Sequence, residues 1–124
     1  MTALVLALAL TLPNPEQSPG VTRPLSTTQV CTTRWGLDRR HVTVAMKRRV
    51  ARAYGIPWAD RRAYEFDHLI PRELGGADDV RNLWPQPIAE ARVKDRQENR
   101  LHRDVCAGRL SLAAAQREMR LWGR

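Results

Sequence analysis

Residues 64–85 hold most of the side chains in this chain that could do chemistry. They read YEFDHLIPRELGGADDVRNLWP, with an Asp-His pair, Asp67-His68, at the end of a short apolar-aromatic run. A Gly-Gly turn and then Asn82 follow downstream. A carboxylate can bind a divalent metal ion, and an imidazole, whose pKa lies near neutrality, can deprotonate water. Hydrolysis of a phosphodiester uses both functions, so the Asp-His pair is a candidate for that chemistry.

The order Asp-His, Gly-Gly, Asn-Leu resembles the motif of the HNH endonucleases (the ββα-metal nucleases), which is roughly DHIxPxxxGG…NL. The resemblance is strongest over residues 64–99 and extends over roughly residues 30–122. It implies that His68 is the general base and that Asp67 binds the metal. It also implies that the Asn82 amide tethers the loop and orients the base; in some relatives this Asn also ligates the metal. The implied cofactor is one divalent cation per site, Mg²⁺ first, with Mn²⁺, Ni²⁺ or Zn²⁺ as alternatives.

The helix expected after Asn82 departs from this pattern. Relatives commonly carry a metal-ligating His or Asn shortly before a Lys-Asp pair, and here that position is Arg92. Arg stays protonated and does not ligate metal, although it could bind a substrate phosphate. Three outcomes are open. Asp67 and Asn82 hold the metal with waters filling a Mg²⁺-type octahedron, Asp95 or Glu98 takes the missing place, or the site is impaired.

The charge of the chain points to a polyanionic partner. Lys and Arg number 21 against 13 Asp and Glu, a net charge of +8, and all but two of these cations are Arg. Arg presents a planar fork that matches phosphate oxygens, so a nucleic acid is the expected partner, DNA ahead of RNA. An Arg-rich genome is the alternative cause. The residues expected to contact phosphates are Arg72, Arg92, Lys94 and Arg96. No base-reading signature is evident, so low sequence specificity is expected.

The N-terminal quarter of the chain bears on export. Residues 1–12, MTALVLALALTL, are apolar and uncharged but too short to span a bilayer. They resemble the h-region of a signal peptide, although no Lys or Arg precedes them. A wrongly assigned start and a buried N-terminal segment are the alternatives. We expect an exported protein, periplasmic or secreted, ahead of a cytoplasmic one. Residues 13–29, rich in proline, are expected to be a linker or arm, leaving 30–124 as the nuclease domain.

Two cysteines, Cys31 and Cys106, allow two states. In an exported chain they could form one disulfide that closes a loop of about 75 residues, worth roughly 3–4 kcal/mol. Two buried free thiols are the alternative.

The elements that must position these residues follow from periodicity and from helix-ending residues. At 124 residues the chain allows one domain with a modest core. Thr43 and Ser111 are expected helix N-caps. The predicted helices are 43–54, 88–105 and 112–122, and the predicted strands are 64–70 and 83–84. This order predicts an α+β fold, a small ββα-metal core with flanking helices. Neighbours on a strand face opposite ways, so Asp67 and His68 need a local twist to share a site.

Three functions are open at this stage. The first is a metal-dependent endonuclease of low sequence specificity that cuts DNA, or RNA as the alternative substrate. The second is a nucleic-acid-binding protein that keeps the fold without turnover. The third is an exported, disulfide-stapled protein whose basic surface binds a cell-envelope polyanion. A monomer and a weak dimer both suit the first reading.

Overall fold

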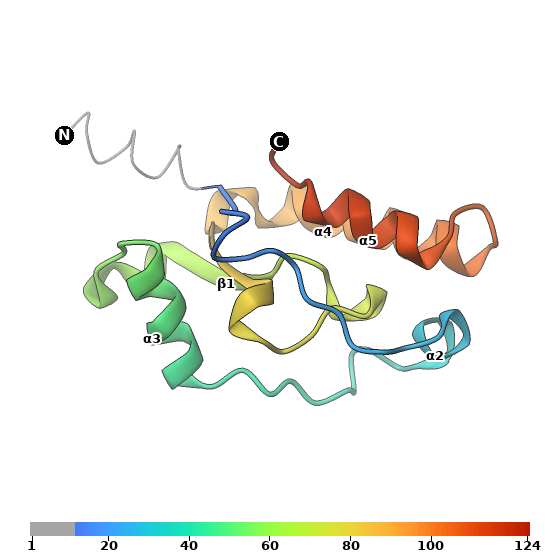
Figure 1. Ribbon diagram of the computed structural model, residues 1–124, viewed down its shortest axis with the longest axis horizontal. Helices are drawn as coiled ribbons and strands as arrows, with labels where there is room; N and C mark the ends of the chain where they lie inside the picture. Colours follow the sequence, from blue (N-terminus) through green and yellow to red (C-terminus); the bar gives the residue numbers. More distant parts are fainter. Residues whose placement is uncertain (1–11) are drawn as a thin grey trace.

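Figure 1 shows the computed structural model, which describes residues 12–124. The segment predicted as an export signal, residues 1–12, lies outside the described residues except for Leu12. The helices and strands of the described part are α2 (Thr27–Thr32), α3 (Val44–Ala53), β1 (Tyr64–His68), β2 (Leu83–Pro87), α4 (Ala91–Cys106) and α5 (Leu112–Arg120). Short 3₁₀ turns connect them: η1 (Trp58–Ala63), η2 (Arg72–Leu74), η3 (Val80–Asn82) and η4 (Ile88–Glu90). This mixture of helices with an antiparallel sheet is an α+β fold.

The strands β1 and β2 pair as an antiparallel ladder in which His68 lies opposite Leu83. The prediction of a second strand limited to 83–84 is wrong, because Pro85 and Pro87 lie inside the ladder instead of bounding it. Both strands of a two-stranded sheet are edge strands, where a residue without an N–H is tolerated. The turn η4 then leads directly into α4, so the strands and the helix follow in the predicted order.

Helix starts are set by side-chain caps. Thr43 caps α3 and Ser111 caps α5, each through a hydroxyl that accepts a hydrogen bond from a backbone N–H of the first turn, which confirms both predicted caps. The short helix α2 was not predicted. Its signal is present in the sequence as a capping box, in which Ser26 and Gln29 satisfy each other's backbone N–H groups.

The proline-rich arm packs against the rest of the chain. Ser18 is fully buried, and its hydroxyl lies 2.6 Å from both the carbonyl oxygen of Leu83 and the hydroxyl of Tyr54. Backbone hydrogen bonds then join the arm to the loop after β1, including one from the N–H of Ala77 to the carbonyl of Val21. In Figure 1 the arm, drawn in blue, crosses the molecule on its way to α2. Of the two forms expected for residues 13–29, a linker or an arm, the segment is therefore an arm that packs against the domain.

The main apolar core lies between the loop after β1 and the two C-terminal helices, which pack side by side (Figure 1). Its buried members are Ile70, Leu74, Leu101, Val105, Ala115 and Met119. Within residues 12–124, no helix combines the length and the apolar character that a membrane crossing would need.

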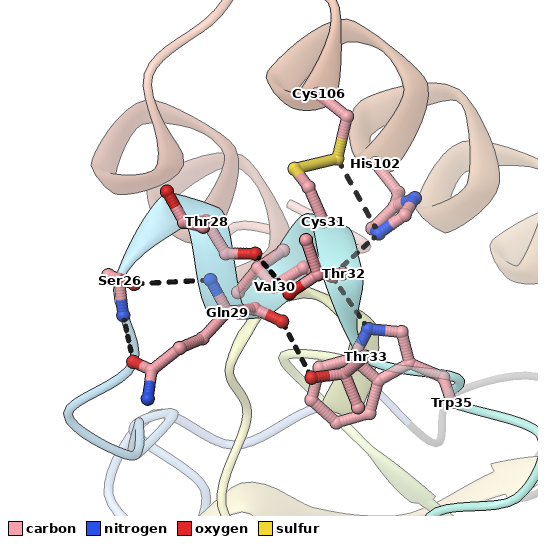
Figure 2. Close-up of a disulfide and its surroundings, with 10 residues drawn as sticks. All are labelled: Ser26, Thr28, Gln29, Val30, Cys31, Thr32, Thr33, Trp35, His102 and Cys106. Atoms are coloured by element: carbon pink, nitrogen blue, oxygen red, sulfur yellow. Dashed lines mark hydrogen bonds between the residues drawn. A yellow bond between two sulfur atoms is a disulfide. The ribbon is translucent and has the colours of Figure 1, made fainter.

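A disulfide between Cys31 and Cys106 attaches α2 to the C-terminal end of α4 (Figure 2). Next to it, Nε2 of His102 and the indole N–H of Trp35 both donate to the carbonyl oxygen of Val30, at 3.2 and 2.9 Å. The structure therefore has the disulfide state and not the two free thiols that the sequence also allowed. The consequence is that α2 is held against α4.

Candidate active site

His68 lies at the C-terminal end of β1 and is only 4% exposed. Its Nε2 is 2.8 Å from Oδ1 of Asp78, on the return limb of the loop that joins the two strands. Burial lowers the pKa of His68 below its ordinary value, and the hydrogen bond and charge of Asp78 offset this only in part. The imidazole is therefore neutral at neutral pH, which a group that takes a proton from water must be.

The carboxylate of Asp78 fixes the tautomer of His68. It accepts hydrogen bonds from the backbone N–H of His41 at 2.8 Å and from Nε of Arg72 at 3.0 Å. Burial raises the pKa of Asp78, but the hydrogen bonds from His41 and His68 and the charge of Arg72 outweigh burial, so this pKa lies below its ordinary value. An ionised carboxylate only accepts hydrogen bonds. The proton of the neutral imidazole is therefore on Nε2, and Nδ1 keeps a lone pair that can accept a proton.

Arg72 braces this pair and does not face a phosphate. Its side chain is 7% exposed, and its guanidinium donates to the carboxylate of Asp38 at 2.7 Å and to the carbonyl oxygen of the same residue at 3.1 Å. It also lies over the ring of Trp35, with 5.9 Å from Cζ to the ring centroid. The expectation that Arg72 binds nucleic acid is corrected, because its donors hold the loop around His68.

Asn82 ties the two ends of that loop together. Its Oδ1 accepts from the N–H of Ile70, and its Nδ2 donates to the carbonyl oxygens of Ile70 and Ala77, all at 3.0 Å. Gly76 permits the close crossing, since a Cβ there would lie 1.7 Å from the carbonyl oxygen of Ile70. Asn82 is fully buried. Its amide therefore tethers the loop behind His68, and the expectation that it also ligates a metal is corrected.

The ammonium of Lys94 lies among three oxygens next to the end of β1. Its Nζ is 2.8 Å from Oδ2 of Asp67, 2.5 Å from Oε2 of Glu98 and 2.7 Å from the carbonyl oxygen of His68. The contact between Nζ of Lys94 and Oδ2 of Asp67 is an ion pair whose geometry is not that of a hydrogen bond. Lys94 has no exposed surface, so the expectation that it binds nucleic acid is corrected.

Two carboxylates share this one ammonium, and their protonation reflects it. Burial lowers the pKa of Lys94, but the charges of Asp67 and Glu98 outweigh burial and raise this pKa above its ordinary value. Burial also raises the pKa of Glu98 to about 7, against the opposing charge of Lys94. When Glu98 carries a proton, the one positive charge of Lys94 faces one negative charge. Glu98 titrates in the neutral range.

The ligands implied for a divalent metal do not come together as a set. Asn82 is fully engaged, Arg92 is an exposed cation, and Glu98 faces Lys94. Across residues 12–124, no three His, Cys, Asp or Glu side chains converge as a protein-built metal site needs. Asp67 and Asp95 are the remaining members of the expected set, and Asp95 is exposed on α4. Mg²⁺ is often held by one or two carboxylates, with water and substrate phosphate as the other ligands, so Asp67 could serve only in that way.

A groove of about 760 Å³ opens along the side of β1 that carries His68. Residues from the loop before α3, from α3, from η1 and from β1 line it. Its charged lining residues are Arg40, Lys47, Arg61, Arg62 and Glu65, and its aromatic ones are Trp58, Tyr64 and Phe66. Burial raises the pKa of Glu65, and the nearby Asp67 and Asp95 raise it further. A groove with four cations and one carboxylate suits a chain of phosphates.

The sequence did not indicate which cations surround the site. Of the residues expected to contact phosphates, Arg92 and Arg96 are exposed on α4 and neither lines the groove. A signal was present in the order Trp58, Arg61, Arg62, which leads directly into β1. Asp78 was also missed, although a carboxylate on the return limb of a Gly-Gly turn is well placed to meet a histidine before the turn.

Comparisons with protein-family models, with curated proteins and with solved structures gave no match to this chain.

Proposed function

We propose that this protein is an endonuclease that hydrolyses phosphodiester bonds of DNA with low sequence specificity, on a core of the HNH type. One observation carries the proposal: a neutral imidazole, held by an ionised carboxylate, lies in a groove lined with cations. The resemblance of Asp67-His68, the Gly-Gly turn and Asn82 to the HNH motif supports the same activity.

The chemistry follows from the position of the lone pair on His68. Water attacks the phosphorus, its proton passes to Nδ1, the new P–O bond forms, and the P–O bond to the 3′ oxygen breaks. The leaving oxygen takes up a proton from solvent. Asp78 stabilises the imidazolium that forms, as the carboxylate does in other carboxylate–histidine pairs. Arg40 and Lys47, among the groove cations, neutralise phosphates of the bound strand and so position the scissile bond.

A divalent cation is a separate part of the proposal. When bound, such an ion polarises a phosphoryl oxygen and stabilises charge on the phosphate. We propose one ion per site, Mg²⁺ first, with Asp67 as its protein ligand. The residues around Asp67 do not form a complete site, so none of the steps given above depends on the ion.

A supercoiled-plasmid assay on the full chain tests the activity. The parent is expected to nick the plasmid, and His68→Ala is expected to lose at least about 100-fold in rate, the lower end of what a general base contributes. His102→Ala, which removes an imidazole beside the disulfide, is the matched control. Mg²⁺, Mn²⁺, Ni²⁺ and Zn²⁺ are compared with EDTA. A His68→Ala protein that cuts as fast as the parent would exclude His68 as the base.

A second candidate function is nucleic-acid binding without turnover. The observation that favours it is the Lys94 ammonium on Asp67, together with Arg92 at the third motif position. It predicts salt-sensitive DNA binding and no nicking with any of the four metals, so the plasmid assay separates the two candidates.

The disulfide supports a proposal about compartment. Disulfides form and persist in oxidising environments and are rare in the cytosol of most organisms. We propose that the chain folds after export, in the periplasm or outside the cell. Detection of the Cys31–Cys106 pair as a disulfide in protein recovered from the native host, with thiols blocked at lysis, would test this; two free thiols would contradict it.

A further inference from the structure

The groove beside His68 contains a stacked pair that the chemistry above does not use. Cζ of Arg61 lies 5.0 Å from the centroid of the Trp58 ring, and Nη1 of Arg61 donates to the carbonyl oxygen of Trp58 at 3.0 Å. Both residues line the groove. Arg48, whose Cζ is 4.6 Å from the same centroid, lines a separate hollow with Trp58 and not the groove. The guanidinium of Arg61 thus lies over an indole at the side of the groove.

The aromatic surface continues from this pair along β1. The ring of Phe66 lies 6.1 Å from that of Trp58, at an interplanar angle of 38°. Tyr64 and Phe66 line the groove on the same strand as His68, and alternate residues of a strand stand about 6.6 Å apart on one face. Flat side chains therefore lead from Trp58 toward the candidate base.

We propose that this groove takes an unpaired strand of nucleic acid, with a base stacked on the Arg61–Trp58 pair. The inference rests on the proposed function, because the strand must present a phosphodiester to His68. In a duplex each base face is covered by its neighbours, so a flat platform in a groove has no base to stack on. In an unpaired strand every base has a free face, and aromatic rings and guanidinium planes are the side chains on which such bases stack.

Two further features favour an unpaired strand. His68 is 4% exposed, so the scissile phosphate must enter the groove to reach it, which a flexible single strand does more easily than a stiff duplex. The groove also interleaves four cations with three aromatic rings, and proteins that bind single strands combine a positive groove with stacking side chains.

The test compares two charge-preserving substitutions within the full chain, both in the His68→Ala background so that no strand is cut. Arg61→Lys keeps the positive charge and removes the flat guanidinium, whereas Arg62→Lys makes the same change at a neighbour for which the structure shows no stacking partner. Binding of a short labelled oligothymidylate and of a duplex of the same length is measured by fluorescence anisotropy. Thermal melts establish that both variants fold.

Arg61→Lys is expected to weaken oligothymidylate binding about five- to tenfold, toward the low end of what one base stack contributes, and to leave duplex binding unchanged. Arg62→Lys is expected to change neither. Equal weakening of both ligands by Arg61→Lys, or a parent that binds the duplex as tightly as the single strand, would overturn the inference. An oligouridylate arm separates RNA from DNA as the strand bound. Failure of the proposed function would appear as a parent protein that cleaves neither the plasmid nor a single strand, and not in these binding ratios.

Discussion

At the scale of single residues, the candidate base depends on partners from two other segments of the chain. Asp78 holds the ring of His68 from the return limb of the loop, and Lys94 on α4 donates to the carbonyl oxygen of the same residue. The sequence located Asp67, His68 and Asn82 by their types and spacing. It could not show that Lys94 is buried, because the sequence gives the residue type and not its surroundings. A lysine that balances two carboxylates and a lysine that contacts phosphate therefore look alike. Burial is a property of the fold.

Asp78→Asn is expected to reduce the cleavage rate by about 10²–10⁴-fold while the protein stays folded. The amide has no charge to stabilise the imidazolium, and its NH₂ group can donate to Nε2 and move the ring proton to Nδ1. Initial rates of plasmid nicking measure the effect. Asp79→Asn is the matched control, since that carboxylate pairs with Arg81 and not with His68. A rate within twofold of the parent for Asp78→Asn would show that Asp78 does not orient the base.

Glu98→Gln is expected to change how stability depends on pH. Because the pKa of Glu98 is raised from 4.5 to about 7 on folding, its contribution to stability is fully present below about pH 4.5 and lost as the pH rises through 7. The glutamine stays neutral throughout. The variant should therefore gain about 1–3 kcal/mol relative to the parent between pH 4.5 and 8. Urea unfolding of both proteins across this range measures the difference, in which the titration of His68 cancels; a constant difference would contradict the raised pKa.

Lys94→Met is expected to destabilise the fold by about 3–5 kcal/mol, because it leaves the buried carboxylate of Glu98 and the half-buried carboxylate of Asp67 without their cation. Arg96→Met, on the exposed side of the same helix, should change the unfolding free energy by no more than about 0.5 kcal/mol. Urea unfolding near pH 8, where Glu98 is ionised, compares the two variants with the parent. Equal small effects would mean that Lys94 is not held by the carboxylates in solution.

At the scale of elements, local signals predicted some boundaries well and others poorly. Capping hydroxyls placed the starts of α3 and α5, because a cap acts within one turn of its own helix. The extent of β2 was misjudged, since whether Pro85 and Pro87 fit a ladder depends on the strand beside them. The packing of the arm was missed for a similar reason. Ser18 is buried through contacts with residues far along the chain.

The disulfide connects these elements to the site. It holds α2, whose Val30 carbonyl accepts from the indole of Trp35, and that indole lies against Arg72. Replacement of both cysteines by serine is expected to lower the unfolding free energy by about 3–4 kcal/mol. Unfolding curves with and without dithiothreitol measure this. The reductant should destabilise the parent to a similar extent and leave the double variant unchanged; a parent that does not respond would argue that the cysteines are not paired.

At the scale of the whole molecule, the groove is assembled from parts that are separate in the sequence. Its lining comes from the loop before α3, from α3 itself, from η1 and from β1, and β1 supplies two of the three aromatic residues. A net charge of +8 predicts a polyanion without indicating which surface binds it. Two surfaces compete for that role, the groove and the exposed side of α4 that carries Arg92 and Arg96.

The salt dependence of single-strand binding distinguishes these two surfaces. If all four groove cations neutralise phosphates, the logarithm of the association constant should fall with the logarithm of salt concentration at a slope of about −3, at roughly 0.7 per contact. Arg40→Gln should make the slope shallower by about 0.7, because one phosphate contact is lost. Arg92→Gln should leave it unchanged, since Arg92 lies outside the groove. Anisotropy titrations over a range of salt concentrations in the His68→Ala background measure all three proteins. The opposite pattern, a slope reduced by Arg92→Gln and kept by Arg40→Gln, would place the strand along α4, and His68 would then lie off its path.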